Sequence, residues 1–252
     1  METSALPVAA MRHQHVVELR RYKLHTGRRE ALIELFDREL VEPQEDCGMA
    51  VLGQFRDHGQ PDHFVWLRGF ADMEARRDGL TQFYGGPVWD AHKDAANATM
   101  ISSDDVLLLR PAWEDAGFDL TGHNRAPVAA IQSVPATAWL TTTHYVRPAD
   151  EQAFVDLFHK KAAPLLSALG AEIAGAFVTE HAENNFSRLP VRAEENVFVW
   201  FSRLASTAAL DKVRDAQHHS QEWSELAMKL EGLCTRAAET SGLQPTARSL
   251  LA

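Results

Sequence analysis

Hydrophobic and polar positions follow two alternating periods along the first hundred residues of the chain. Val16 to Leu24 reads VVELRRYKL, a loose alternation rich in β-forming residues, which predicts a strand. Apolar residues then recur at helical spacing from Arg28 to Gln44, which predicts an amphipathic helix. The segment continues with strands at Met49 to Phe55 and Phe64 to Phe70, two helical pieces that meet at Gly85-Gly86-Pro87, and a short strand at Asp105 to Arg110. The predicted order is βαββαβ.

The second half of the chain repeats this order. Trp66 recurs as Trp200, 134 residues later, whereas Gly53 recurs as Gly175, 122 residues later. The second copy therefore carries 12 extra residues, which fall in one hairpin at Ala182 to Ala193. Long loops beside cavities are often lids, so a lid and a plain surface loop both remain open for this insert. The second copy is predicted to contain strands at Trp139 to Val146, Ala171 to Glu180 and Val197 to Leu204, and a closing strand at Ala247 to Ala252. Its helices are predicted at Pro148 to Leu169 and Ser206 to about Thr240.

Such self-similarity predicts the fold class. Each copy is expected to form an antiparallel sheet with two helices on one face, the ferredoxin-like arrangement, and the bare face of each sheet must be covered. We therefore expect an α+β protein in which two tandem ferredoxin-like (βαββαβ) halves pack sheet to sheet as an α/β barrel around a shared cavity. The predicted organisation is a disordered tail (1–15), a first domain (16–111), a linker (112–138) and a second, divergent domain (139–252).

Several short motifs point to a family. They are Glu18-Leu19-Arg20-Arg21-Tyr22, Gly53-Gln54-Phe55, Val65-Trp66, Pro87-Val88-Trp89 and Leu107-Leu108-Leu109-Arg110-Pro111. In this order they resemble the NIPSNAP family of the dimeric α/β-barrel superfamily, well over the first half and in degraded form from Trp139 onward. The family has no shared catalytic set, so the resemblance implies a fold and not a reaction. The wider superfamily includes monooxygenases, isomerases, cyclases and haem-dependent dehydratases, which implies a ligand-binding lumen.

Composition limits the classes of molecule that the protein is expected to bind. The chain has 252 residues, is 45% hydrophobic and carries a formal net charge of -10, as an ordinary soluble globular protein does. This charge disfavours nucleic acid and anionic membranes as partners, and a small-molecule substrate is expected instead. The two cysteines, Cys47 and Cys234, fit a reducing compartment and predict a cytoplasmic protein. Homo-oligomerisation is left open.

The candidate catalytic residues lie on the first strand. Because side chains alternate between the faces of a strand, Glu18, Arg20 and Tyr22 share one side. If Val17 and Leu19 face the helices, this trio faces the lumen, where it could orient a substrate and move a proton. A plain Glu18–Arg20 ion pair with no catalytic role is the competing interpretation.

The second copy is expected to add Tyr145 to the trio, at an offset of 123 from Tyr22. If the face assignment slips by one residue, Arg21 and His144 replace the trio. The residues expected to contact substrate are Phe55, Trp66, Thr143, His144, Phe177 and Trp200. The tryptophans also have a simpler interpretation as helix-to-sheet core.

The 12 histidines do not predict a metal site, because none has the spacing that places two ligands on one helix face beside a third. No cofactor and no metal are expected, and the purified protein should be colourless. The expected function is a cofactor-independent enzyme acting on a hydrophobic small molecule in the lumen, as an isomerase, cyclase, dehydratase or oxygenase, with a place in secondary metabolism left open. The alternatives are a non-catalytic ligand-binding or scaffolding module and a haem-dependent enzyme.

Overall fold

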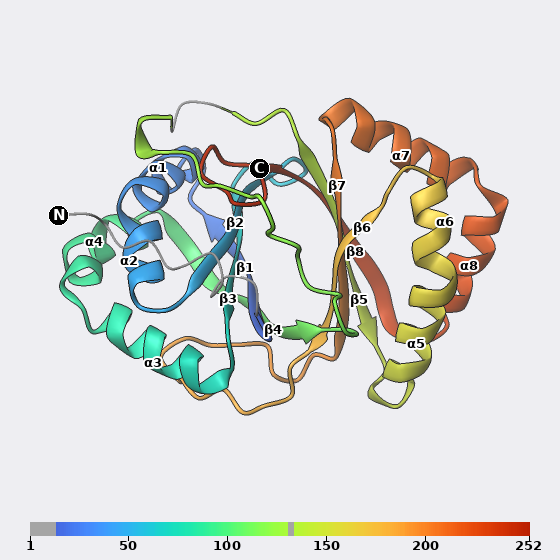
Figure 1. Ribbon diagram of the computed structural model, residues 1–252, viewed down its shortest axis with the longest axis horizontal. Helices are drawn as coiled ribbons and strands as arrows, with labels where there is room; N and C mark the ends of the chain where they lie inside the picture. The colour runs from blue at the N-terminus through green and yellow to red at the C-terminus, as the bar shows by residue number, and fades with distance from the viewer. Residues whose placement is uncertain (1–13, 131–133) are drawn as a thin grey trace.

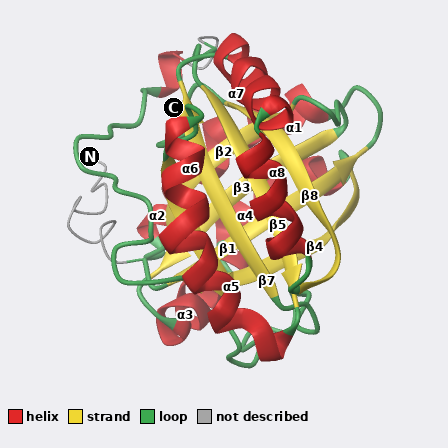
Figure 2. Ribbon diagram, turned by 90° about the vertical axis from the view of Figure 1, so that its right-hand side faces the viewer, coloured by secondary structure: helices red, strands yellow, loops and turns green. Residues whose placement is uncertain are grey.

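A computed structural model of the chain describes residues 14–130 and 134–252. Its eight strands form one closed barrel in the order β1-β3-β2-β8-β5-β7-β6-β4, flanked by helices on two opposite sides (Figures 1 and 2). The predicted tail (1–15) lies outside the described residues except for Gln14 and His15. The predicted fold class, two ferredoxin-like halves packed sheet to sheet, is confirmed.

The first half contributes four strands and one helical layer. Its longest helical segment contains a π-helical turn, η2, between α1 and α2. The elements are β1 (Val16–Leu24), α1 (Arg29–Leu35), η2 (Phe36–Leu40), α2 (Val41–Asp46), β2 (Ala50–Asp57), β3 (His63–Phe70), α3 (Met73–Tyr84), α4 (Pro87–Asn97) and β4 (Met100–Pro111).

The second half repeats these elements, π-helical turn included. Two short 3-10 turns, Val128–Ala130 and Pro148–Asp150, precede its first two regular elements. The elements are β5 (Ala138–Val146), α5 (Glu151–Leu157), η5 (Phe158–Ala162), α6 (Ala163–Ala168), β6 (Ile173–Thr179), β7 (Val197–Leu204), α7 (Thr207–His219), α8 (Gln221–Glu231) and β8 (Cys234–Pro245).

The two offsets read from the sequence relate the halves through the whole chain. In the ladders Arg20 lies opposite Trp66, and Thr142 lies opposite Trp200, so β1 and β5 are related by 122 residues. The offset of 134 relates β4 to β8, which end the two halves. The predicted closing strand at Ala247 to Ala252 is therefore wrong, and the helix predicted to reach Thr240 ends at Glu231.

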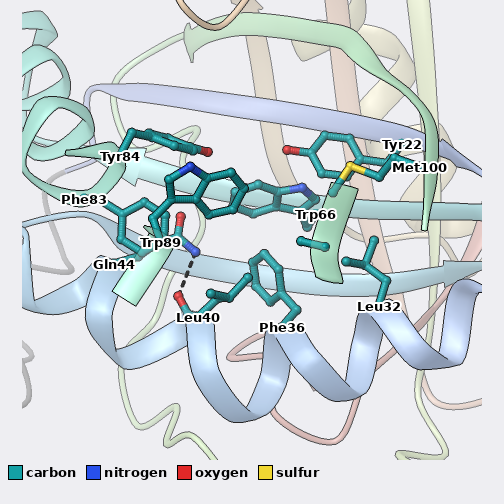
Figure 3. A pocket seen from close by; sticks show the side chains of 11 residues that line it. Tyr22, Leu32, Phe36, Leu40, Gln44, Trp66, Phe83, Tyr84, Trp89 and Met100 are labelled. Atoms are coloured by element: carbon teal, nitrogen blue, oxygen red, sulfur yellow. Dashed lines mark hydrogen bonds between the residues drawn. The ribbon is translucent and has the colours of Figure 1, made fainter. Parts of the chain in front are cut away.

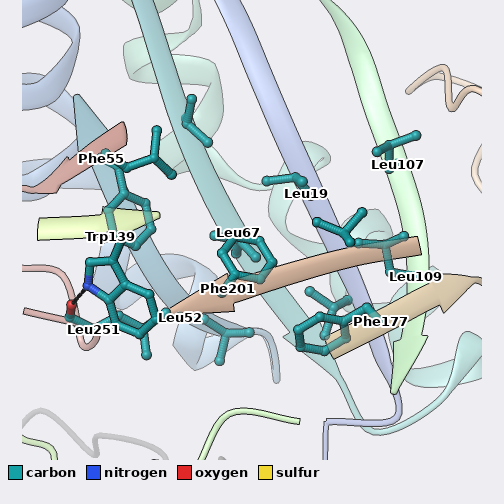
Figure 4. Packing of buried hydrophobic residues seen from close by; sticks show 14 of the residues in the cluster. Leu19, Leu52, Phe55, Leu67, Leu107, Leu109, Trp139, Phe177, Phe201 and Leu251 are labelled. Carbon is teal, nitrogen blue, oxygen red and sulfur yellow. Dashed lines mark hydrogen bonds between the residues drawn. The ribbon is translucent and has the colours of Figure 1, made fainter. Parts of the chain in front are cut away.

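The wrong closing strand has a physical cause. Residues 235–240 read TRAAET, a run of good helix formers without apolar alternation, and most of them are exposed on β8. Pairing with β5 determines the strand conformation there, against local propensity. Thr246 to Ala252 instead forms a turn-containing segment, in which the Leu251 carbonyl accepts a hydrogen bond of 2.8 Å from Trp139 Nε1 (Figure 4).

Three apolar layers hold the molecule together. One lies in the barrel interior between the two sheets, and each of the others lies between a sheet and its own helices. Phenylalanine rings fold back over the repeated glycines in the interior: a Cβ on Gly53 would lie 2.5 Å from the Phe55 ring, and one on Gly175 would lie 3.0 Å from the Phe177 ring. The interior is lined by Leu19, Leu52, Leu67, Leu107, Leu109, Trp139, Phe177, Val199, Phe201 and Leu243, among others (Figure 4).

Two short ladders join the halves. β2 pairs with β8 through Phe55 to Asp57, and β4 pairs with β6 through Leu109 to Pro111. The segment predicted as a linker also packs against the interior, because Leu120 belongs to the interior cluster and Phe118 lies against it. None of the described helices is long and apolar enough to cross a membrane.

Candidate functional site

The strand β1 is buried on both faces, and the predicted assignment of those faces is wrong. Val17 and Leu19 point into the barrel interior, so Glu18, Arg20 and Tyr22 face the helices of the first half and not the lumen. Alternation shows which residues share a face, but it does not show which face meets helices when both are buried. The two aliphatic side chains therefore lie in the closed interior, and the polar trio lies between the sheet and the helices of the first half.

Tyr145, which the second half was predicted to add to the trio, does not lie beside Tyr22. Tyr145 points into the barrel interior, on the opposite side of the sheets from Tyr22. The offset of 123 is one residue too long: with the ladder offset of 122, Tyr22 corresponds to His144. The alternative with Arg21 and His144 is right only for β1, where Arg21 points inward and donates a hydrogen bond of 3.0 Å to Thr143 Oγ1. His144 faces the helices of the second half.

The remaining predicted contact residues divide between the layers. Phe55 and Phe177 are interior packing residues (Figure 4). Thr143 is buried. Trp66 lies between sheet and helices in the first half, and Trp200 occupies the same place in the second. Apolar side chains fill most of the interior, and the cavity that remains among Val17, Leu52 and Phe177 has a volume of about 40 Å³, room for one or two water molecules. The predicted lumen is therefore too small for a hydrophobic substrate unless side chains move.

The predicted Glu18–Arg20 pair is real, and it belongs to a larger cluster. Arg20 Nη1 donates to Glu18 Oε2 at 2.7 Å, and Arg68 Nε donates to the same oxygen at 2.8 Å. Arg76 Nε donates to Glu18 Oε1 at 2.7 Å. All four side chains are 0% exposed. Three guanidinium groups therefore surround one carboxylate, and the group is called the arginine cluster below.

Arg68 and Arg76 are not among the site residues predicted from the sequence. Arg76 lies four and seven residues before Leu80 and Phe83, so it occupies an apolar helix position. The offset of 134 gives a second signal, because it aligns Arg76 with Leu210 and Arg68 with Ser202, both buried. An arginine at a core position indicates a buried ion pair.

Burial and charge act against each other in this cluster. Burial alone would raise the pKa of Glu18, but Arg68, Arg20 and Arg76 outweigh it and hold the pKa well below its usual range. Burial would lower the pKa of Arg20, yet Tyr22 and Glu18 raise it above its ordinary value. For Tyr22 burial dominates and raises the pKa of the phenol. Glu18 is thus ionised and Tyr22 protonated at neutral pH.

An aromatic cavity adjoins the arginine cluster (Figure 3). Its volume is about 30 Å³, room for one or two water molecules. In Figure 3 the hydroxyl groups of Tyr22 and Tyr84 point toward one another, with the indole rings of Trp66 and Trp89 beside them. Arg20 Nε donates to the Tyr22 oxygen at 2.9 Å, and Arg68 Nη1 donates to the Tyr84 oxygen at 3.4 Å. The lining residues are Tyr22, Leu32, Phe36, Leu40, Gln44, Trp66, Phe83, Tyr84, Trp89, Ala96 and Met100.

The 12-residue insert reaches across to this site. It connects β6 to β7 and passes beneath the barrel to α3 (Figure 1). Arg76 Nη1 donates to Asn184 Oδ1 at 3.1 Å and to Asn185 Oδ1 at 2.8 Å. The Phe186 ring lies 5.9 Å from that of Tyr84. The second half therefore covers the arginine cluster of the first.

The described residues form no obvious metal centre. No group of three or more histidine, cysteine, aspartate or glutamate side chains in 14–130 and 134–252 has a metal-binding arrangement. The aromatic cavity has no histidine among its lining residues. The expectation of a metal-free, colourless protein stays a prediction.

Comparison with known proteins bears on the first half. The NIPSNAP family model matches residues 17–113, which confirms the resemblance of the motifs there. No curated protein sequence matches the chain.

Solved structures are similar over nearly the full length. A candidate monooxygenase from Lactobacillus acidophilus has a TM-score of 0.54 at 11% identity and covers 93% of this chain and 97% of its own. A candidate monooxygenase from Fusobacterium nucleatum has a TM-score of 0.56 at 8% identity, with 92% of each chain covered. An anthrone oxidase-like protein has a TM-score of 0.56 at 11% identity, also with 92% of each chain covered. At these identities the likeness concerns the fold.

Proposed function

Starting from the NIPSNAP-like first half, whose helix layer contains the arginine cluster, we propose that the protein is an enzyme for an aromatic or conjugated small molecule. The substrate binds between the sheet and helices of the first half, not in the barrel interior. The observation that carries the proposal is the pair of phenols, Tyr22 and Tyr84, each held by a buried arginine at the edge of an aromatic cavity.

The hydrogen bonding of Tyr22 suits it to act as an acid. Its oxygen accepts from Arg20 Nε, which leaves its own O–H group free to donate. Burial raises the pKa of Tyr22, so the phenol holds its proton at neutral pH. A carbonyl oxygen placed between Tyr22 and Tyr84 would receive two hydrogen bonds as it gains charge in an enolate or phenolate.

Stabilisation of an enolate is a step common to isomerases, cyclases, dehydratases and cofactor-independent oxygenases. The similar folds of candidate monooxygenases and of an anthrone oxidase-like protein favour the oxygenase among these. In such a reaction an anthrone and one O₂ give the anthraquinone and one water. Solvent takes the ring-methylene proton while Tyr22 and Tyr84 stabilise the enolate oxygen. The enolate carbon then bonds to O₂, and the hydroperoxide formed on protonation loses water to give the quinone.

A polycyclic substrate requires the cavity to expand. The helix α4 is the element suited to move, because Ala96 is its only buried residue and it begins after Gly85-Gly86. Trp89, at its N-terminal end, forms one wall of the cavity. Binding should therefore change the fluorescence of Trp89.

The experiment is a titration with anthrone, first without oxygen and then with it. We expect saturable quenching of tryptophan fluorescence anaerobically and catalysed O₂ uptake aerobically. Tyr22→Phe should lower turnover by about 10²-fold, while the matched variant His144→Phe in the second half leaves it unchanged. Binding without turnover would favour the non-catalytic module, and equal turnover by wild type and Tyr22→Phe would contradict the assigned role.

A further inference from the structure

The arginine cluster has more positive charge than its surroundings balance. Arginine side chains stay protonated in proteins, so Arg20, Arg68 and Arg76 bring three positive charges against the single negative charge of Glu18. Glu18 is the only acid in contact with them among the described residues. Because Tyr22 stays protonated, its phenol supplies no negative charge. Two positive charges thus lie in a site with no solvent exposure, which is costly unless an anion joins them.

Unused hydrogen-bond donors accompany the excess charge. Nη2 of Arg20 and Nη2 of Arg76 are buried and have no hydrogen-bond partner among the described residues. Nη2 of Arg68 lies 2.7 Å from Glu18 Oε2 but out of line for a hydrogen bond. The Glu18 oxygens already accept three bonds from the cluster. Buried N–H groups are nearly always paired, so these donors indicate a missing acceptor.

The fold itself does not require this charge. At the equivalent places of the second half stand Leu140 for Glu18, Thr142 for Arg20, Ser202 for Arg68 and Leu210 for Arg76. That half builds the same sheet and helices with an apolar layer. A role in stabilising the fold therefore does not explain why the first half contains the arginine cluster.

We infer that the arginine cluster is a binding site for the carboxylate of an acidic substrate, with Arg20 and Arg76 Nη2 as the donors. This inference rests on the proposed function and narrows its substrate class to aromatic carboxylic acids. Guanidinium groups match the planar geometry of a carboxylate. Asn184 and Asn185 of the insert cover Arg76, so a carboxylate that reaches Arg76 from this side must displace them. The aromatic part of the substrate occupies the adjoining cavity.

The test compares benzoate with its uncharged analogue benzamide, at constant ionic strength and without other carboxylates. Calorimetric titration should give saturable binding of benzoate and at least tenfold weaker binding of benzamide. Arg76→Leu, which installs the second-half residue, should weaken benzoate binding at least tenfold. Arg77→Leu removes the same charge from the adjacent, exposed position and should leave it unchanged.

Two outcomes would overturn the inference: equal binding of benzoate and benzamide, or an equal effect of Arg76→Leu and Arg77→Leu. Circular dichroism and thermal melting of Arg76→Leu confirm that the variant is folded. Anthrone carries no carboxylate, so its binding and oxidation test the proposed function separately. A protein that oxidises anthrone but does not distinguish benzoate from benzamide would keep the function and lose the anion site.

Discussion

The two helix-to-sheet layers of this chain share a fold and differ in chemistry. Both contain a tryptophan on the central strand, Trp66 or Trp200, packed against a phenylalanine of the π-helical turn, Phe36 or Phe158. The first layer adds a buried carboxylate and three buried arginines, whereas the second has one buried histidine, His144, hydrogen-bonded to Trp200 Nε1 at 3.3 Å. The second layer shows what the fold needs, and the excess in the first layer points to ligand binding.

The largest effect is expected from breaking the arginine cluster at its centre. Glu18→Gln leaves three buried guanidinium groups without a counter-charge, and the free energy of unfolding should fall by about 3–5 kcal/mol. Urea denaturation measures this. Glu195→Gln is the control, because Glu195 pairs with Arg192 and Arg236 at a partly exposed site, where the loss should not exceed about 1 kcal/mol.

Converting the whole cluster tests the comparison directly. The combined variant Glu18→Leu, Arg20→Thr, Arg68→Ser and Arg76→Leu gives the first layer the residues of the second. It should fold with a free energy of unfolding at or above that of wild type, since apolar replacement of buried ion pairs is often neutral or stabilising. A stability as low as that of Glu18→Gln would show that the cluster is structural.

Two further buried groups titrate in acid, one in each half, and they act on stability in opposite directions. Burial lowers the pKa of His144 to about 4. The unfolded chain therefore binds the proton first, and stability falls as pH drops from about 6.5 to about 4. Burial raises the pKa of Asp37 to about 6, although Thr246 and Arg248 oppose it. The folded chain there binds the proton first, so stability falls as pH rises from about 4 to about 6.

Single variants should separate these opposing slopes. Wild type should lose about 3 kcal/mol of the free energy of unfolding toward low pH through His144, and His144→Phe should not show this loss. Asp37→Asn should likewise not show the loss of similar size that Asp37 causes toward neutral pH. Urea denaturation between pH 4 and 7 gives the slopes. Neither change in slope depends on a ligand. Parallel profiles for wild type and both variants would contradict the assignment.

The smallest effect concerns the two buried tyrosines. Tyr22→Phe removes the acceptor of Arg20 Nε and should lower the free energy of unfolding by about 1 kcal/mol. In Tyr145→Phe the lost contact is a 3.5 Å approach of Arg192 Nη2, so the decrease should be about half as large. Thermal melting compares the pair. A larger loss for Tyr145→Phe would reverse the ranking of the two hydroxyl groups.

The repeat made the architecture predictable, because matched tryptophans and glycines fix both offsets. The same offsets also predict where the last strand lies. Added to the bounds of β4, the offset of 134 places the closing strand at Cys234 to Pro245, where local composition favours helix. Long-range strand pairing outweighs local propensity at such a position, and the repeat is the sequence feature that predicts the strand.

The site was less predictable, for two physical reasons. A strand buried on both faces shows the same alternation whichever face meets the helices, so Glu18, Arg20 and Tyr22 could be grouped but not placed. Arg68 and Arg76 come from other elements, and their contact with Glu18 depends on tertiary packing. The role of the insert was equally invisible, because Asn184 and Asn185 act on the half of the molecule to which they do not belong.

The short ladder between β2 and β8 forms late in the synthesis of the chain. β8 is the last strand, so a nascent chain holds the edge of β2 and the apolar face around Leu19, Leu52 and Leu67 open until residues 112–245 have left the ribosome. During that interval the exposed apolar face can pack against the same face of another nascent copy of the chain. Slow synthesis or crowded polysomes therefore favour pairing between chains, and prompt delivery of the C-terminal strand is what makes this barrel a single molecule.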